Sequence, residues 1–254
     1  EQKEIEKRVT SRLKKNKTRF ENPPVFVKKY SRPDEIMSLL YCHQPYKKQV
    51  IKNNTELKVY PDNGWGLFKL QDISLSFRAG NSDVNHGTKN LNSIQLAKGN
   101  VRLLENVGNS PYPMGWFKAR DLYPENQTLT KNSLLVNGIG QIKYGESDWG
   151  YRDNKMWSDA ALTCPPFIHK IKRNVSLHDS AIKLEDEFAT EQPSHHEIRF
   201  FSYGSFEKIN TNTWKVIAGN ESVFLTFKSD HELFINQYEF PHSIGVRPAA
   251  NLLR

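Results

Sequence analysis

The segment SLSFRAGNSDVNHGTKNLNSIQLAKGNVRLLENVG, residues 74–108, indicates the fold class of this chain. Polar and apolar residues alternate in it, which is typical of strands because successive side chains point to opposite faces. Gly, Asn and Asp residues separate the apolar runs, and His86 lies in the most polar part. The flanking segments WGLFKL (65–70) and TLTKNSLLVNGIGQ (128–141) extend the pattern. We therefore predict short antiparallel strands joined by turns around one histidine.

Strand-like runs follow one another from residue 57 to the C-terminal region. Turn residues recur roughly every 8–12 positions, the spacing of an antiparallel sandwich. No helical pattern intervenes, which argues against parallel βαβ units. The sequence thus predicts a mainly β protein, with a large antiparallel β-sandwich domain over residues 56–254.

The first 55 residues have a different pattern. Ile5, Val9 and Leu13 are spaced by four positions in a basic segment, which favours a helix. A second helical candidate begins at Ser31, which can cap it, with Pro33 in the first turn. We predict a short helical segment over residues 1–55, joined to the sandwich by a polar linker.

The composition limits the possible partners. The 254 residues carry a formal net charge of +8, which suits an anionic partner such as nucleic acid or an acidic polysaccharide. The basic residues are crowded in the first thirty positions and are then scattered among acids, and no nucleic-acid-binding motif accompanies them, so nucleic acid is not expected. No apolar run approaches the ~20 residues that span a bilayer, so no membrane partner is expected. The two cysteines exclude a disulfide-dense scaffold.

The common motifs of catalytic and metal sites are missing from the sequence. There is no GxSxG or CxxC motif, and none of the eight histidines forms the HxH pair that would place two ligands on one face of a strand. His195 and His196 are adjacent and would point to opposite faces of a strand. The residues alone therefore indicate a β-rich domain with a preference for an anionic ligand.

Residues 57–200 resemble the sandwich domain of the heparinase II/III-like family. The family pattern has a strand with an Arg, a segment of the type H-x-H-x-D-x-x-S-F, and later HNT followed by V-G-x-Q. The matching positions here are Arg78, His86, Asn92, Ser93, Gly108, Tyr112, Asn132, Gly138 and Gln141.

This resemblance implies an α/α toroid domain in the same polypeptide, followed by the sandwich, with the polymer in the cleft between them. Residues 1–55 would then be the end of the toroid, and the protein would be periplasmic or extracellular. Members are mostly lyases that cleave uronate-containing polysaccharides by β-elimination. The resemblance implies that His86 is catalytic and that Arg78, Asn92, Tyr112 and Trp116 lie near the sugar.

The family's metal site is altered in this sequence. Thr88 and Lys131 stand where the family has metal-binding histidines, and the acidic ligand falls at Glu105 or Asn106. A hydroxyl and an ammonium cannot replace two imidazoles, because a metal ligand must offer a lone pair. We therefore expect no cofactor, and Lys131 is expected to supply a cation in place of the metal, paired with Glu105.

Three functions remain open from the sequence, and with them the question of whether the protein is an enzyme. The first is the sandwich portion of a polysaccharide lyase-like protein that acts on acidic polysaccharide. The second is a non-catalytic carbohydrate-binding or scaffold domain that has lost its metal and its activity. The third is a sandwich without a sugar partner, whose basic N-terminus contacts another protein or nucleic acid.

Overall fold

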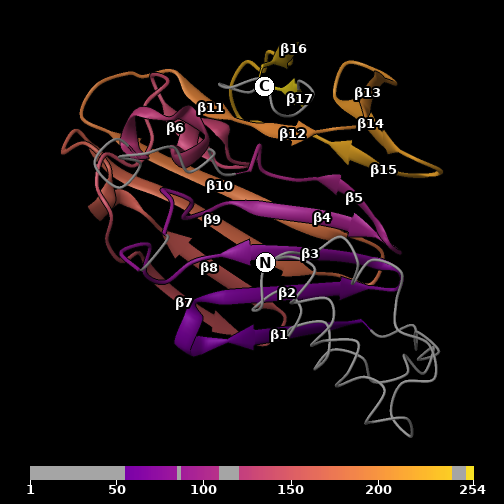
Figure 1. The fold of residues 1–254 in the computed structure, drawn as a ribbon, viewed down its shortest axis with the longest axis horizontal. Helices are drawn as coiled ribbons and strands as arrows, with labels where there is room; N and C mark the ends of the chain where they lie inside the picture. The colour runs from indigo at the N-terminus through magenta and orange to yellow at the C-terminus, as the bar shows by residue number, and fades with distance from the viewer. Residues whose placement is uncertain (1–54, 85–86, 109–119, 242–249) are drawn as a thin grey trace, which may run out of the picture. The chain divides into compact units, whose positions relative to one another are not determined.

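The computed structural model describes residues 55–84, 87–108, 120–241 and 250–254, which form antiparallel sheets (Figure 1). The first large sheet has the strand order β1 (Glu56–Tyr60), β2 (Trp65–Leu70), β3 (Ile73–Arg78), β4 (Ile94–Lys98), β5 (Val101–Leu104). The second has the order β10 (Ile182–Thr190), β9 (Ile168–Leu177), β8 (Lys155–Asp159), β7 (Asp148–Arg152). Figure 1 shows these two sheets one behind the other.

Smaller sheets complete the described part. They are β11 (His196–Ile198) with β6 (Leu134–Val136), then β12 (Phe200–Ser202), β17 (Ala250–Leu253) and β16 (Gln237–Phe240), and finally β13 (Ser205–Lys208), β14 (Thr213–Ala218) and β15 (Glu221–Thr226). The helical elements described are short 3-10 turns: η2 (Pro61–Asn63), η3 (Arg120–Leu122), η4 (Pro124–Asn126), η5 (Thr128–Thr130) and η6 (Ala161–Thr163). No helix among the described residues has the length and hydrophobicity needed to cross a bilayer.

The core lies between the two large sheets. Phe68 and Phe77 come from the first sheet, Met156 and Val175 come from the second, and all four are fully buried in one cluster. Each such side chain contributes about 1.5–3 kcal/mol by leaving water. The pleat of the strands determines which side chains enter the core. On β2, for example, alternate residues are buried and the others face outward. The predicted mainly β fold and antiparallel sandwich are therefore confirmed.

Four of the observed strands were not predicted: β7, β8, β13 and β17. The hairpin of β7 and β8 shows the reason. On β8 the inward residues are Met156 and Ser158, whereas Trp157 between them faces outward, so hydrophobicity does not follow the alternation. Residues 1–54 lie outside the described residues, so the helical segment over residues 1–55 stays a prediction, as does the domain boundary at its end.

Candidate functional site

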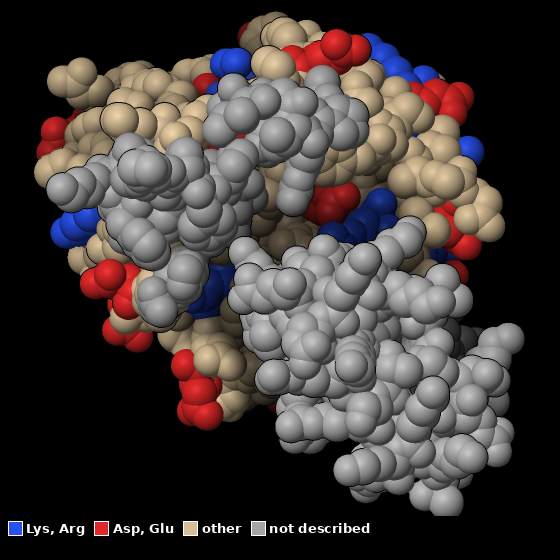
Figure 2. Space-filling view, viewed as in Figure 1, with Lys and Arg blue, Asp and Glu red and all other residues tan. Residues whose placement is uncertain are grey.

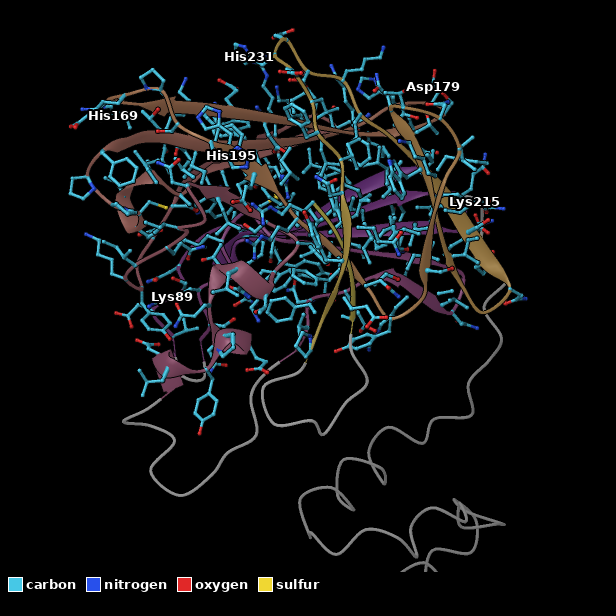
Figure 3. The ribbon with its side chains drawn as sticks, turned by 90° about the horizontal axis from the view of Figure 1, so that it is seen from above. Lys89, His169, Asp179, His195, Lys215 and His231 are labelled. Atoms are coloured by element: carbon cyan, nitrogen blue, oxygen red, sulfur yellow. The ribbon has the colours of Figure 1, made fainter. Side chains whose placement is uncertain are left out.

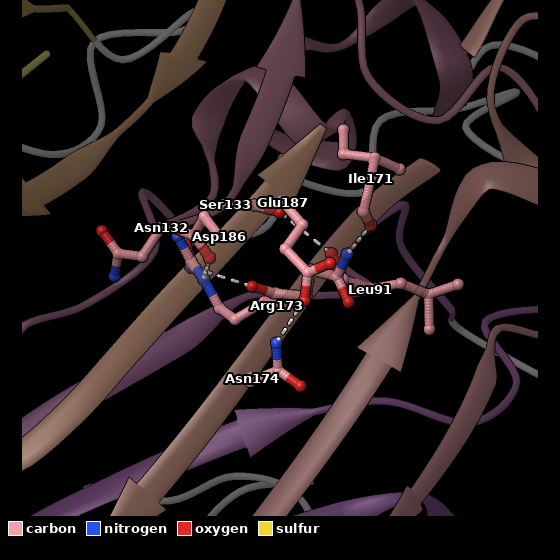
Figure 4. A network of polar contacts seen from close by, with 9 residues as sticks. Leu91, Asn132, Ser133, Ile171, Arg173, Asn174, Asp186 and Glu187 are labelled. Carbon is pink, nitrogen blue, oxygen red and sulfur yellow. Dashed lines mark hydrogen bonds and ion pairs between the residues drawn. The ribbon is translucent and has the colours of Figure 1, made fainter. Parts of the chain in front are cut away.

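Arg173 on β9 is the centre of a buried polar network (Figure 4). Its side chain is 0% exposed, and Nε and Nη2 donate to the two carboxylate oxygens of Asp186 at 2.7 and 2.8 Å. Nη1 donates to the main-chain oxygens of Asn92 at 3.0 Å and Asn132 at 3.1 Å. The guanidinium is thus neutralised by one carboxylate and fixes two loops. We call Asn92, Asn132, Arg173 and Asp186 the Arg173 network.

Asn132 is completely buried and uses its whole amide group. Its Nδ2 donates to the main-chain oxygen of Ile94 at 2.9 Å, and its Oδ1 accepts from the main-chain nitrogen of Phe201 at 2.6 Å. Its own main-chain nitrogen donates to Oδ1 of Asn106 at 2.8 Å. Asn132 therefore joins β4, β12 and the segment that follows β5.

Asn92 and Arg78, two of the predicted substrate-binding residues, lie next to each other. Asn92 has a left-handed backbone (φ 62°), which Asn adopts more readily than most residues. Its main-chain nitrogen donates to the oxygen of Arg78 at 2.8 Å, and its Nδ2 donates to the oxygen of Ile171 at 2.7 Å.

The guanidinium of Arg78 points into the protein. It donates to the main-chain oxygens of Asn63, Ala79 and Asn81, and its carbon lies 5.4 Å from the ring centroid of Trp65. Burial lowers the pKa of Arg78. These contacts are structural, and a contact of Arg78 or Asn92 with substrate stays a prediction.

The network continues into the segment next to His86. Ser133 Oγ and Gln141 Nε2 both donate to the main-chain oxygen of Leu91, at 2.9 and 3.3 Å. Thr128 Oγ1 donates to the oxygen of Lys89 at 3.0 Å. The main-chain oxygens of Lys89 and Leu91 are therefore held by the segment 128–141.

Three predicted site residues, His86, Tyr112 and Trp116, lie outside the described residues. Their proposed roles in catalysis and in sugar binding stay predictions.

Lys131, at one of the altered metal positions, is a buried lysine with 2% of its surface exposed. Its Nζ donates to the main-chain oxygens of Gly108 at 3.1 Å and Glu125 at 2.6 Å. Burial lowers the pKa of Lys131 to about 8, and the charge of Glu125 acts in the opposite direction. The ammonium thus bridges two loops through their carbonyl groups.

The other altered positions do not complete a metal site. Glu105 pairs with Arg102 at 3.1 Å, so the expected pair of Glu105 with Lys131 is not formed among the described residues. The Asn106 side-chain oxygen is taken by Asn132, and Thr88 is half-buried. Within the described part of the chain, no three His, Cys, Asp or Glu residues come together as metal ligands. The residues at these positions do not fit a divalent cation.

The histidines that the structure describes lie on the surface and are spread over the sandwich, as the labelled His169, His195 and His231 illustrate (Figure 3). His169 lies 3.8 Å from a carboxylate oxygen of Glu191. His196 stacks on Phe188 with ring centroids 4.5 Å apart, and burial lowers its pKa. These contacts are those of surface and packing residues.

One candidate site was missed by the sequence reasoning. An open pocket of about 380 Å³ lies on the second large sheet, and its lining includes Arg152, Lys155, Trp157, Lys172 and Asn174. We call it the Trp157 pocket. The signal that could have revealed it is the spacing of Lys155 and Trp157, which places both on one face of a strand. On the face drawn in Figure 2, by contrast, the described basic and acidic side chains are interspersed.

Several solved structures share this fold. No protein-family model and no curated protein sequence matches the chain. A heparinase III described as the BT4657 gene product is 13% identical with a TM-score of 0.61, and the match covers 100% of this chain and 39% of that chain. A mutant of the heparan sulfate lyase HepC from Pedobacter heparinus is 15% identical with a TM-score of 0.60. A further heparinase III is 9% identical with a TM-score of 0.59. Each of these two matches covers 79% of this chain and 34% of the other chain.

The chain therefore spans about a third of the length of these structures. At sequence identities of 9–15%, these comparisons establish a shared fold. The resemblance to the heparinase II/III-like family that the sequence predicts is confirmed at that level: this chain has the β-sandwich fold of the heparinase III structures.

Proposed function

We propose that the chain is the sandwich portion of a polysaccharide lyase-like protein that cleaves acidic, uronate-containing polysaccharide by β-elimination. The observation that carries the proposal is the fold shared with chains named heparinase III and heparan sulfate lyase. The net charge of +8 supports an anionic substrate. An N-terminal toroid domain of the same polypeptide would provide the other wall of the substrate cleft.

In this reaction a base removes the proton α to the uronate carboxylate, and the electron pair forms a double bond as the glycosidic C–O bond breaks. A positively charged or hydrogen-bonding group stabilises the enolate, and an acid protonates the leaving oxygen. His86 is the residue that we assign to this chemistry from the sandwich. Arg78, Asn92, Tyr112 and Trp116 are proposed to lie near the sugar.

The Arg173 network supports the assignment of His86 because it holds the segment that follows this residue. Arg173 holds the main-chain oxygen of Asn92, and Ser133 and Gln141 beside the network hold that of Leu91, so the segment after His86 is fixed. A catalytic side chain has to be held in a narrow range of geometries, and a rigid buried support provides this. Lys131 would replace the family's metal ion in its structural role, because its ammonium joins the loops of Gly108 and Glu125.

The test is the absorbance of unsaturated uronate products, measured with the full-length protein on heparin, heparan sulfate and alginate. We expect product from at least one polymer and a loss of at least roughly a hundredfold in His86→Ala, as for removal of a general acid or base. His195→Ala is the matched control, because His195 is an exposed histidine of the same domain. No product from any acidic polymer, or full activity of His86→Ala, would contradict the proposal.

A further inference from the structure

The Trp157 pocket is built from one row of cross-strand neighbours on the outer face of the second large sheet. In the register, Trp157 on β8 lies opposite Gly150 on β7 and Asn174 on β9. Their neighbours Met156 and Val175 point into the core, so by alternation these three face outward. The pocket and the core therefore use opposite faces of the same strands.

Gly150 determines how the indole of Trp157 lies. A Cβ atom at Gly150 would come within 2.5 Å of Cζ2 and 3.0 Å of Cε2 of that ring. The ring thus lies over the glycine and across the sheet, and any side chain at position 150 would displace it. A half-buried indole in this position offers a rigid apolar surface beside polar groups.

The acidic residues near the ring are engaged by groups other than Lys155 and Lys172. Asp159, opposite Lys172, accepts hydrogen bonds from the main-chain nitrogens of Ala161 and Ile171 at 3.0 and 3.1 Å. Glu187 pairs with Lys170 at 3.3 Å.

On the other side, Glu185 pairs with Lys183 at 2.7 Å. Among the described residues, Lys155 and Lys172 make no ion pair or hydrogen bond, although their charges act at longer range on Glu185 and Glu187. Arg152 pairs with Asp153 at 3.7 Å, but both side chains are almost fully exposed, and such pairs contribute little.

Asn174 adds a fixed polar group to the floor of the pocket. It is buried, and its Nδ2 donates to Glu187 at 3.0 Å, so its orientation is set. An aromatic surface, ammonium groups without a direct ion-pair partner and an oriented amide are features that suit a sugar ring bearing negative charges. The volume of about 380 Å³ lies in the range of small-ligand pockets, roughly 300–1,000 Å³.

We propose that the Trp157 pocket binds an acidic saccharide unit, with the sugar ring on Trp157 and its sulfate or carboxylate groups on Lys155 and Lys172. The pocket would hold the same class of polymer that the proposed function requires, as a second contact beside the one assigned to His86. This assignment rests on the proposed function and adds a second place of contact for the polymer.

The experiment measures the binding of a sulfated tetrasaccharide to the full-length protein by calorimetry, with a neutral tetrasaccharide and inorganic polyphosphate as comparison ligands. We expect Lys155→Ala/Lys172→Ala to weaken binding by at least roughly tenfold. The matched control is Lys208→Ala/Lys215→Ala, which removes the same charge from two lysines that also lie beside aromatic rings, at 6.0 Å from Trp214 and Phe224. We expect less than about a twofold change there.

Trp157→Leu separates a sugar site from a general polyanion surface. It should weaken the sulfated tetrasaccharide about tenfold and leave polyphosphate binding unchanged, because polyphosphate has no ring to stack. Equal losses in both double lysine variants, equal losses for both ligands in Trp157→Leu, or no binding by the unmodified protein would each overturn the proposal. Thermal unfolding of every variant verifies that it is folded.

The binding experiment can be interpreted without the cleavage assay. Loss of product in His86→Ala with unchanged tetrasaccharide affinity supports both assignments. Absence of product from every polymer contradicts the proposed lyase activity alone, as long as the Lys155 and Lys172 variants still lose affinity for the tetrasaccharide.

Discussion

The two faces of β9 carry positive charges in different environments. Arg173, on the inner face, is 0% exposed, and its guanidinium contacts one carboxylate and two carbonyl groups. Lys172, the preceding residue, is on the outer face and makes no direct ion pair with the described residues. The buried charge is fully satisfied and holds the fold, whereas the outer charge remains available to a ligand. Substitutions should therefore separate stability from binding along a single strand.

The largest effect is expected from Arg173→Leu. This change leaves the carboxylate of Asp186, 9% exposed, without its partner, and removing one member of a buried pair destabilises by about 3–5 kcal/mol. Urea unfolding measures the loss. The double variant Arg173→Leu/Asp186→Leu should recover part of it, because no unpaired charge remains. A loss below about 1 kcal/mol in the single variant would contradict the central role of Arg173.

An intermediate effect is expected from the titration of Lys131. Its folded-state pKa of about 8 lies below its ordinary value of 10.5, so the unfolded chain binds more protons between these two pH values. The free energy of unfolding should therefore gain a contribution as pH rises from about 8 to 10.5, on the order of 2 kcal/mol.

The comparison of urea unfolding at pH 7.5 and pH 10 between the unmodified protein and Lys131→Gln isolates this contribution. Gln can still donate a hydrogen bond but does not titrate. The same dependence on pH in both proteins would show that Lys131 is not the group responsible.

The smallest effect on stability is expected on the outer face. Lys155→Ala/Lys172→Ala should change the free energy of unfolding by no more than about 0.5 kcal/mol, because neither ammonium takes part in an ion pair or hydrogen bond among the described residues. The urea midpoint and slope measure this. A loss near that of Arg173→Leu would remove the distinction between the two faces.

The fold could be predicted because hydrophobic alternation and turn residues mark most of its strands. In SLSFR the apolar positions point into the core, and β3 is found where it was expected. The hairpin of β7 and β8 escaped prediction because Trp157 faces outward and Ser158 inward, contrary to their hydrophobicity. The outward position of the half-buried Trp157 goes with its close contact with Gly150, which the residue type alone does not indicate.

The site could be predicted only in part. Arg78, Asn92 and Asn132 match the family pattern in the sequence, and in the structure Asn92 bonds to Arg78 while Arg173 joins Asn92 to Asn132. Arg173 and Asp186 were missed, because charged residues in strands ordinarily face solvent. A signal was present: Arg173 occupies the inward position between Ile171 and Val175.

The contacts of Arg173 also bear on the order of folding. Its hydrogen bonds to the carbonyl groups of Asn92 and Asn132 join residues 81 and 41 positions apart in the chain. Contacts between such distant segments form slowly, because the entropy of closing the intervening loops opposes them. We infer that the segment following His86 reaches its native geometry late, after the hairpin of β9 and β10 has formed.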